Sequence, residues 1–283
     1  MSSQDLLLFR SLWGFAGDLR QAIQEAKLHG FDGLEVNLQH SVLQGGSPAE
    51  INEQLHKAGL ALIIELVSGG DYVPDLSLSW QQHLAQLDQQ LTKAEQYNPR
   101  RVNLIAGCDS WSDATQDCFL EALLDRIDHC RCPVSLETHR SRSLFNPWAI
   151  AALLRRHPRL RLTADISHWC AVSERLMTPE LQPIRAMADR VDHIHARVGH
   201  SQGPSVGHPF APEWTDALDA HRRCWQHFVL SQQARGDGPG SITPEFGPDG
   251  YLPTLPFTGM PVADLDDINA SMAQWLRRGA LKH

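Results

Sequence analysis

The chain has 283 residues, of which 42% are hydrophobic and 20% are charged. These values are ordinary for a globular protein with a large core, so folding should need neither disulfides nor a structural metal. The formal net charge of -8 argues against a nucleic-acid partner, because a negative chain repels phosphate backbones unless it carries a local basic strip.

Targeting signals and cysteine frameworks do not stand out in the sequence. The stretch MSSQDLLLFRSLWGF lacks the basic region and the cleavage site of a signal peptide, and no run of about 20 apolar residues predicts a membrane span. The six cysteines are scattered, and no second pair completes a zinc site with Cys130 and Cys132. We therefore expect a cytoplasmic protein with reduced thiols and no membrane contact.

The chain repeats one unit eight times: a β-rich run, a polar loop and a helical pattern. The pattern predicts strands at residues 8–15, 33–38, 60–67, 101–107, 133–139, 160–166, 191–198 and 241–246. It predicts helices at residues 18–30, 47–59, 80–98, 113–130, 146–158, 178–190, 211–232 and 263–279. Residues 47–59 show the helix signals best, with Ser47 as N-cap, Glu50 as its capping-box partner and Gly59 at the exit.

Strands that alternate with helices are parallel and joined by crossovers. Eight such units in 283 residues fit a closed (β/α)8 barrel, an α/β TIM barrel that forms a single domain over residues 1–283. A doubly wound open sheet is the alternative. That fold in its dinucleotide-binding form needs a G-x-G-x-x-G turn after the first strand, and the sequence FAGDLR does not supply it.

Polar residues stand at the ends of four consecutive predicted strands, where the active site of such a barrel lies. They are Glu137, Asp165, His195 and Glu245. At equivalent heights their side chains would converge, and three neighbouring carboxylates would repel one another and raise their pKa values. A divalent cation removes that cost, and oxygen ligands with one imidazole suit Mn²⁺, Mg²⁺ or Co²⁺, with Zn²⁺ as an alternative.

Each of these residues also has a purely structural interpretation, and the case for a metal rests on the set. Glu137 could cap a helix or pair with Arg140, and Glu245 could pair with Arg235. Asp165 could N-cap a short turn beside His168. His193 and His195 could be core histidines, which is the interpretation we favour for His193.

Further residues are weaker candidates. Glu35 could touch substrate or make a structural bond inside the barrel, and Glu65 precedes a glycine turn. The loop of residues 199–209 is expected to fold over the site and bring in His200 or His208, or else to lie in solvent. The flat faces of Trp13, Trp111 and Trp169 would suit a sugar ring, although core packing is the commoner role of tryptophan.

The segments LETH, ADISHW, HIHAR and PEFGP follow one another on the last four predicted strands. In this order they resemble the xylose isomerase-like TIM-barrel superfamily, which includes sugar isomerases and epimerases, dehydratases and endonuclease IV. The resemblance implies that Glu137, Asp165, His195 and Glu245 bind one divalent metal ion. It implies proton transfer by Glu137 and Glu245, and a contact of His168 with substrate or with a metal-bound water. A homo-oligomer is an open alternative, because relatives often form one.

The departures from the family pattern keep the reaction open. The epimerases carry a second Glu where this chain has Ser143, and their substrate Arg lies further from the metal His than Arg197 does. The triplet Glu-Thr-His, which ends in His139, is closer to the pattern of the dehydratase branch than to that of the epimerases.

We expect a metal-dependent isomerase or epimerase that acts on a small polyhydroxy carbonyl compound through an enediolate, with the substrate bound by Arg197, His139, Glu35 and Trp169. A dehydroshikimate- or inosose-type dehydratase on the same scaffold is the alternative. A nuclease like endonuclease IV ranks lower, because the third and fourth strand ends lack histidines. A non-catalytic barrel ranks lower as well, because the ligand set is intact.

Overall fold

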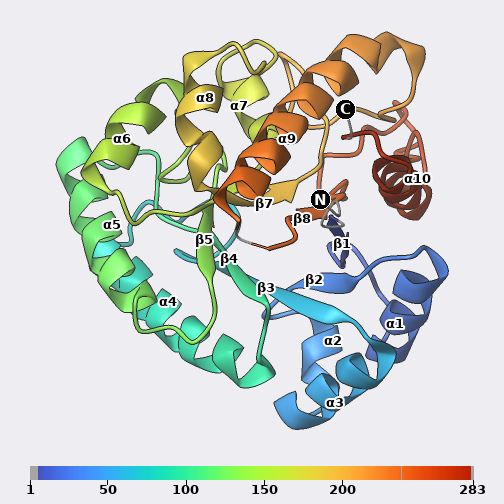
Figure 1. Ribbon diagram of the computed structural model, residues 1–283, viewed down its shortest axis with the longest axis horizontal. Helices are drawn as coiled ribbons and strands as arrows, with labels where there is room; N and C mark the ends of the chain where they lie inside the picture. Colours follow the sequence, from blue (N-terminus) through green and yellow to red (C-terminus); the bar gives the residue numbers. More distant parts are fainter. Residues whose placement is uncertain (1–5, 237, 282–283) are drawn as a thin grey trace.

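The computed structural model describes residues 6–236 and 238–281. Its eight strands are all parallel and close into one barrel in the order of the sequence, with the last strand paired to the first (Figure 1). This confirms the predicted (β/α)8 fold for the described residues of the single predicted domain. The strands are β1 (Leu7–Ser11), β2 (Gly33–Asn37), β3 (Ala61–Val67), β4 (Arg101–Ile105), β5 (Val134–Glu137), β6 (Leu162–Ala164), β7 (Val191–His195) and β8 (Ser241–Thr243).

Helices surround the strands as an outer ring, which is visible in Figure 1. The α-helices are α1 (Leu19–Leu28), α2 (Ser41–Gln44), α3 (Pro48–Ala58), α4 (Trp80–Ala94), α5 (Asp113–Ile127), α6 (Ile150–Arg156), α7 (Ile166–Val172), α8 (Gln182–Met187), α9 (Thr215–Arg235) and α10 (Leu265–Arg277). Short 3-10 turns are η1 (Glu95–Tyr97), η2 (Pro147–Ala149), η3 (Ala188–Arg190) and η4 (Pro212–Trp214). Within the described ranges, none of the helices is long and apolar enough to cross a bilayer.

The predicted helix signals act where they were expected. The Ser47 side chain accepts a hydrogen bond from the Glu50 backbone N–H, and the Glu50 carboxylate accepts one from Ser47 in return. Gly59 ends α3 in the left-handed conformation, at a φ of 71°, which costs a glycine little. These caps fix where α3 begins and ends, and therefore where the polypeptide enters β3.

The strands divide the interior into two layers with opposite chemistry. In β3, Leu62, Ile64 and Leu66 belong to the apolar core between strands and helices. The alternate residues Ile63 and Glu65 are buried as well but lie outside that core cluster, as expected from the two-residue period of a strand. The barrel axis is therefore where buried polar residues gather.

Two short helices and the lengths of the last strands differ from the prediction. Helix α2 was not expected, and α7 begins at Ile166, inside the residues predicted as the sixth strand. Strand β7 ends at His195 and β8 at Thr243, so Arg197 and Glu245 lie two residues beyond their strands. Asp165 ends β6 early because its side chain accepts the Ser167 N–H and so begins α7.

Candidate functional site

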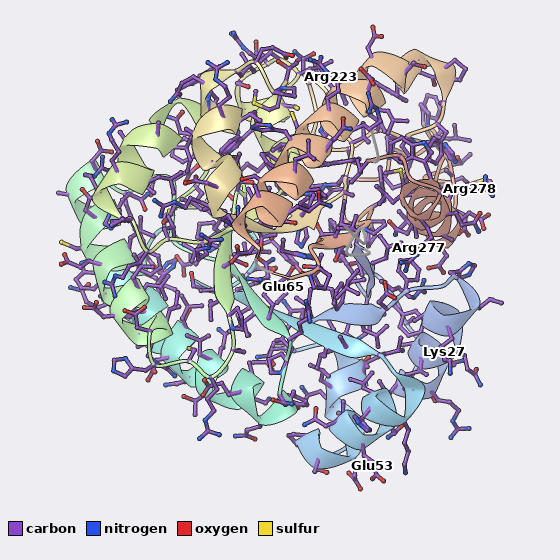
Figure 2. The ribbon with its side chains drawn as sticks, viewed as in Figure 1. Lys27, Glu53, Glu65, Arg223, Arg277 and Arg278 are labelled. Atoms are coloured by element: carbon purple, nitrogen blue, oxygen red, sulfur yellow. The ribbon has the colours of Figure 1, made fainter. Side chains whose placement is uncertain are left out.

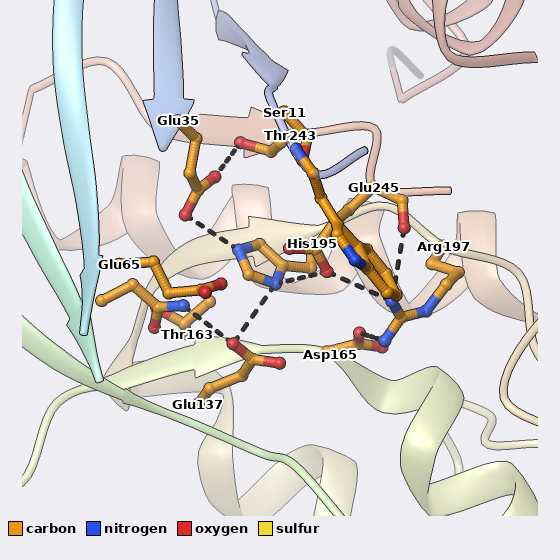
Figure 3. Close-up of polar contacts among 12 residues, drawn as sticks. Ser11, Glu35, Glu65, Glu137, Thr163, Asp165, His195, Arg197, Thr243 and Glu245 are labelled. Atoms are coloured by element: carbon orange, nitrogen blue, oxygen red, sulfur yellow. Dashed lines mark hydrogen bonds and ion pairs between the residues drawn. The ribbon is translucent and has the colours of Figure 1, made fainter. Parts of the chain in front are cut away.

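Four side chains predicted as metal ligands come together at the C-terminal rim of the barrel. Glu137, Asp165, His195 and Glu245 each offer one ligand atom, and these atoms all lie within 4.8 Å of one another. All four side chains are buried. Figure 3 shows them converging from different strand ends on one region of space.

Strand register explains the convergence. Glu137 pairs with Thr163 across β5 and β6, and His195 pairs with Thr243 across β7 and β8. Each ligand thus stands at or just beyond the carboxyl end of its strand, at a similar height along the barrel axis. Neighbouring parallel strands bring such positions together without any long loop.

Asp165 caps a helix with one carboxylate oxygen and directs the other into the site. One oxygen, Oδ1, accepts the backbone N–H of Ser167 at 2.9 Å and caps α7. The other, Oδ2, faces the site and accepts a hydrogen bond from Arg197. The cap holds the carboxylate rigidly, so the structural and the ligating interpretations are compatible.

His195 is the residue that best tests whether a metal fits. Its Nε2 donates to Glu35 Oε1 at 3.0 Å. Its Nδ1 is buried and makes no hydrogen bond among the described residues, although Glu245 Oε2 lies 3.0 Å away and Glu137 Oε2 lies 3.5 Å away. An orphaned imidazole nitrogen ringed by carboxylate oxygens is a donor set that fits a divalent cation, and the hydrogen bond at the other nitrogen is typical of a metal-binding histidine.

The electrostatics of the site show how crowded its charges are. Burial, reinforced by the nearby Glu137, raises the pKa of Glu245 to about 7 although His195 and Arg197 oppose the shift. Burial also raises the pKa of Asp165, with Glu137 adding to the effect. Burial acts on Glu137 too, but the adjacent His195 outweighs it and lowers the pKa of Glu137 to about 2. Carboxylates in these environments gain from a nearby cation.

Arg197 supplies one positive charge to this cluster. Its Nη1 lies 3.3 Å from Glu245 Oε2, and its Nη2 donates to Asp165. Burial would lower the pKa of Arg197, but these two acids hold it above its usual value. Burial would lower the pKa of His195, but Glu245, Glu35 and Glu137 raise it well above its usual value, so His195 shares with Arg197 the positive charge that faces these acids. A divalent ion in place of that proton would balance the same carboxylates.

Two further histidines lie beside the cluster. His168 Nε2 is 2.8 Å from Arg197 Nη2, and its ring packs 3.9 Å from the ring of His139. Burial lowers the pKa of His139 to about 4 and holds that of His168 well below its ordinary value. Both imidazoles are therefore neutral near pH 7, and a neutral imidazole can accept or donate a hydrogen bond to substrate.

A cavity of about 540 Å³ opens beside the cluster and gives substrate access to it. Four of its wall residues were predicted to serve catalysis or substrate binding: Glu137, Glu245, Arg197 and His139. Trp13 also lines it, as one of the three tryptophans proposed from sequence.

Glu65 is a cavity residue whose importance the sequence did not reveal. Its Oε1 accepts hydrogen bonds from Asn37 Nδ2 at 3.0 Å and from the Tyr72 hydroxyl at 3.1 Å. Burial, with the charges of Glu245 and Glu137, raises the pKa of Glu65 to about 8. Figure 2 shows Glu65 near the middle of the ring of strands, whereas Lys27 and Glu53 point outward from the periphery. Its inward position on β3, two residues after Ile63, was the available sequence signal.

Two predicted substrate contacts are corrected by the structure. Trp169 is fully buried in the apolar core, where its Nε1 donates to the Leu144 carbonyl at 2.8 Å, because α7 turns it away from the cavity. Glu35 does not line the cavity; its two oxygens are used by His195, His193 and Thr243. Glu35 therefore orients the histidine rather than touching substrate.

The remaining candidates also lie apart from the cavity wall. His193 is a core histidine, bonded to Ser241 at 2.8 Å and to Glu35 at 3.1 Å, as favoured from sequence. His200 packs against Trp214 and His208 against Phe210. Trp111 packs against His83 and Phe119.

The ion pairs suggested from sequence for Glu137 with Arg140 and for Glu245 with Arg235 are replaced by other contacts. Glu137 accepts a hydrogen bond from Asn103, and Glu245 pairs with Arg197.

Solved structures match the whole length of this barrel. D-allulose 3-epimerase from Methylomonas sp., in complex with D-allulose, matches with a TM-score of 0.64 and 16% identity over 98% of both chains. The probable 3-DHS dehydratase AsbF from Bacillus anthracis matches with a TM-score of 0.64 and 14% identity over 96% of this chain and 98% of its own. IOLI, with a bound zinc atom, matches with a TM-score of 0.65 and 12% identity over 96% and 98%.

This chain has the xylose isomerase-like TIM-barrel fold. No protein-family model matches its sequence, and no curated protein does. At these low identities, the similarity between this chain and the solved structures concerns the fold. The matched structures include epimerases and a dehydratase, and one of these structures holds a metal.

Proposed function

We propose that this chain is a divalent-metal-dependent isomerase or epimerase of a small sugar or other polyhydroxy carbonyl compound. The observation that supports this most is the orphaned Nδ1 of His195 within a ring of buried carboxylates. Glu137, Asp165, His195 and Glu245 would hold a single Mn²⁺, Mg²⁺ or Co²⁺ ion, with Zn²⁺ as an alternative. When bound, such an ion polarises a carbonyl group as a Lewis acid.

The residues of the chain would perform the proton transfers. Glu137 and Glu245 both line the cavity, so a carboxylate oxygen of one can take a proton from the carbon next to the carbonyl. The other can return a proton to the neighbouring carbon or to the opposite face. Arg197 also lines the cavity and can donate hydrogen bonds to the oxygen on which negative charge develops. His168 contacts Arg197 but does not line the cavity, so it would hold that guanidinium in place.

A dehydratase is the second candidate, and the position of His139 favours it. His139, which matches the pattern of the dehydratase branch, lies in the cavity wall beside Glu137. Its Nδ1 donates to the Arg140 carbonyl at 2.5 Å, which leaves Nε2 as the free nitrogen. Removal of the same substrate proton, followed by loss of a β-hydroxyl group as water, would give an unsaturated product.

One experiment separates the two reactions. The Mn²⁺-loaded protein is incubated in heavy water with ketoses, hydroxypyruvate, inosose and dehydroshikimate, and each sample is followed by NMR. An isomerase or epimerase incorporates deuterium and gives a product of unchanged composition. A dehydratase releases water and forms a carbon–carbon double bond.

A matched pair of variants completes the test. Glu245→Gln removes a proposed ligand and proton carrier, and we expect it to abolish exchange. Glu121→Gln makes the same chemical change on the exposed face of α5 and should leave exchange intact. A wild-type protein that neither binds Mn²⁺ nor exchanges a proton in any of these compounds would refute the proposal and favour a non-catalytic barrel.

A further inference from the structure

The cavity wall divides into two parts by burial. The inner part is formed by buried residues, among them Glu137 and Glu245, two of the four proposed metal ligands. The outer part is formed by half-buried and exposed residues: Trp13, Asp71, Tyr72, Val73, Arg140, Ser141, Asp249 and Tyr251. A substrate thus meets two distinct environments along one continuous cavity.

The volume exceeds what one small sugar needs. The cavity has a volume of about 540 Å³. A ketohexose has only about 12 non-hydrogen atoms, and most of them would lie in the inner part, next to the proposed metal. The cavity is within the range of about 300–1,000 Å³ typical of larger ligands. The outer part therefore has room for a second group.

The tryptophan and tyrosine rings of the wall all lie in its outer part. The ring of Trp13 lies 4.9 Å from that of Tyr251 and 6.1 Å from that of Tyr72. Polar groups of Ser141, Asp71 and Asp249 lie among them in the same wall. Flat apolar faces interspersed with hydrogen-bonding groups suit a hydroxylated ring, which has both an apolar face and a polar edge.

Trp13 is held in place for such a contact. Its Nε1 donates to Asp249 Oδ2 at 2.9 Å. Gly247 permits the close approach of the indole, because a Cβ at that position would lie only 2.0 Å from Trp13 Cε3. A ring fixed before binding loses little entropy when a ligand stacks on it.

We propose that the substrate of this site carries a second sugar ring, which packs against Trp13 and Tyr72 while the reacting polyhydroxy carbonyl unit lies in the inner part. This inference rests on the proposed function and names its substrate class as a glycosylated ketose rather than a free monosaccharide. The outer aromatic residues then determine specificity, and the inner residues perform the chemistry.

Binding of a matched pair of sugars tests the inference. D-Fructose and isomaltulose, which is the same ketose with a glucose ring attached, are titrated into the Mn²⁺-loaded protein by calorimetry. We expect isomaltulose to bind about tenfold more tightly, a gain within reach of stacking on aromatic rings. Trp13→Ala should remove this preference, and Trp13→Phe should restore part of it.

The control is Trp148→Ala, which removes a tryptophan that is 49% exposed and lies outside the cavity. It should keep the full preference for isomaltulose. Equal binding of the two sugars by the wild type overturns the inference but leaves the proposed function standing, because proton exchange is measured separately. The inference also fails if neither sugar binds.

Trp13 also lies 5.7 Å from the Arg197 guanidinium, so its removal could act through that residue. An equal loss of affinity for both sugars in Trp13→Ala would show that Trp13 only positions Arg197, and the inference would fail. Tyr72→Ala provides an independent check, since no ring contact joins Tyr72 to Arg197 among the described residues. It should weaken isomaltulose more than D-fructose.

Discussion

The two ends of this barrel each carry a cluster of charged residues, and the clusters are built in opposite ways. At the N-terminal end of the strands, Asp192 accepts from three arginines, with Arg101 at 3.2 Å, Arg235 at 3.4 Å and Arg161 in close contact. Burial opposes its charge, but these arginines hold the pKa of Asp192 below its usual value. At the C-terminal end, several carboxylates surround one guanidinium and an imidazole nitrogen without a hydrogen bond.

The difference shows which cluster is structural. The Asp192 cluster is complete in itself, because every charge has a partner within the chain or reaches solvent. The cluster at the C-terminal end keeps excess negative charge in a buried place, which costs stability unless a cation binds. Such uncompensated sites are characteristic of function, and they lie at the face of the barrel where chemistry is expected.

The largest effect that distinguishes the two ends should be on catalysis. Glu245→Gln should lower proton exchange by about a thousandfold or more, because it removes a proposed metal ligand and a proton carrier. Asp192→Asn, at the other end, should leave exchange within about twofold of wild type. NMR in heavy water with the best substrate measures both. Equal losses in the two variants would contradict the division of roles.

The second effect concerns stability. Asp192→Asn should lower the free energy of unfolding by about 3 kcal/mol, because it leaves three arginines without their largely buried carboxylate. Asp219→Asn is the matched control, since Asp219 is 53% exposed and pairs with Arg222 in solvent. It should cost about 0.5 kcal/mol or less. Urea unfolding measures both, and similar midpoints would mean that the Asp192 cluster is not a structural centre.

The third effect uses the metal as a probe of the C-terminal end. Free Mn²⁺ at about 100 times its dissociation constant should stabilise the fold by about 2.7 kcal/mol. The same increment is expected in Asp192→Asn, because that site is remote, but not in Glu245→Gln. Thermal unfolding with and without EDTA measures it. An unchanged increment in Glu245→Gln would place the ion somewhere else.

The last effect is a pH dependence of opposite sign at the two ends. Burial and nearby carboxylates raise the pKa of Glu65 from 4.5 to about 8, so the folded metal-free protein keeps a proton that the unfolded chain releases. Stability from this group is full below pH 4.5 and is lost as the pH rises to 8. Asp192 behaves in reverse, because its pKa is lowered from 3.8; its contribution is lost as the pH falls below that value.

Melting temperatures of the EDTA-treated protein across this pH range measure the Glu65 contribution. Glu65→Gln should flatten the loss on the alkaline side, because an amide does not titrate. Glu121→Gln, on the exposed surface of α5, should leave the profile unchanged. A wild-type profile that rises toward pH 8 would contradict the expected protonation of Glu65 in the folded state.

The sequence by itself determined the barrel and the set of polar residues that converge at its C-terminal rim. Strand and helix periodicity, caps such as Ser47 and the equivalent positions of Glu137, Asp165, His195 and Glu245 are local properties, and parallel strands translate them directly into space. A residue at the end of one strand must lie near the residue at the end of the next.

Only the tertiary structure decided what each side chain faces. Glu65 lines the cavity with a raised pKa because Tyr72 and Glu245 approach it from other segments. Trp169 is withdrawn into the core because an unforeseen helix begins at Ile166, and Glu35 orients His195 from β2. Spacing fixes the direction of a side chain relative to its own backbone, but burial, partners and charge come from residues distant in sequence, which only the folded chain brings together.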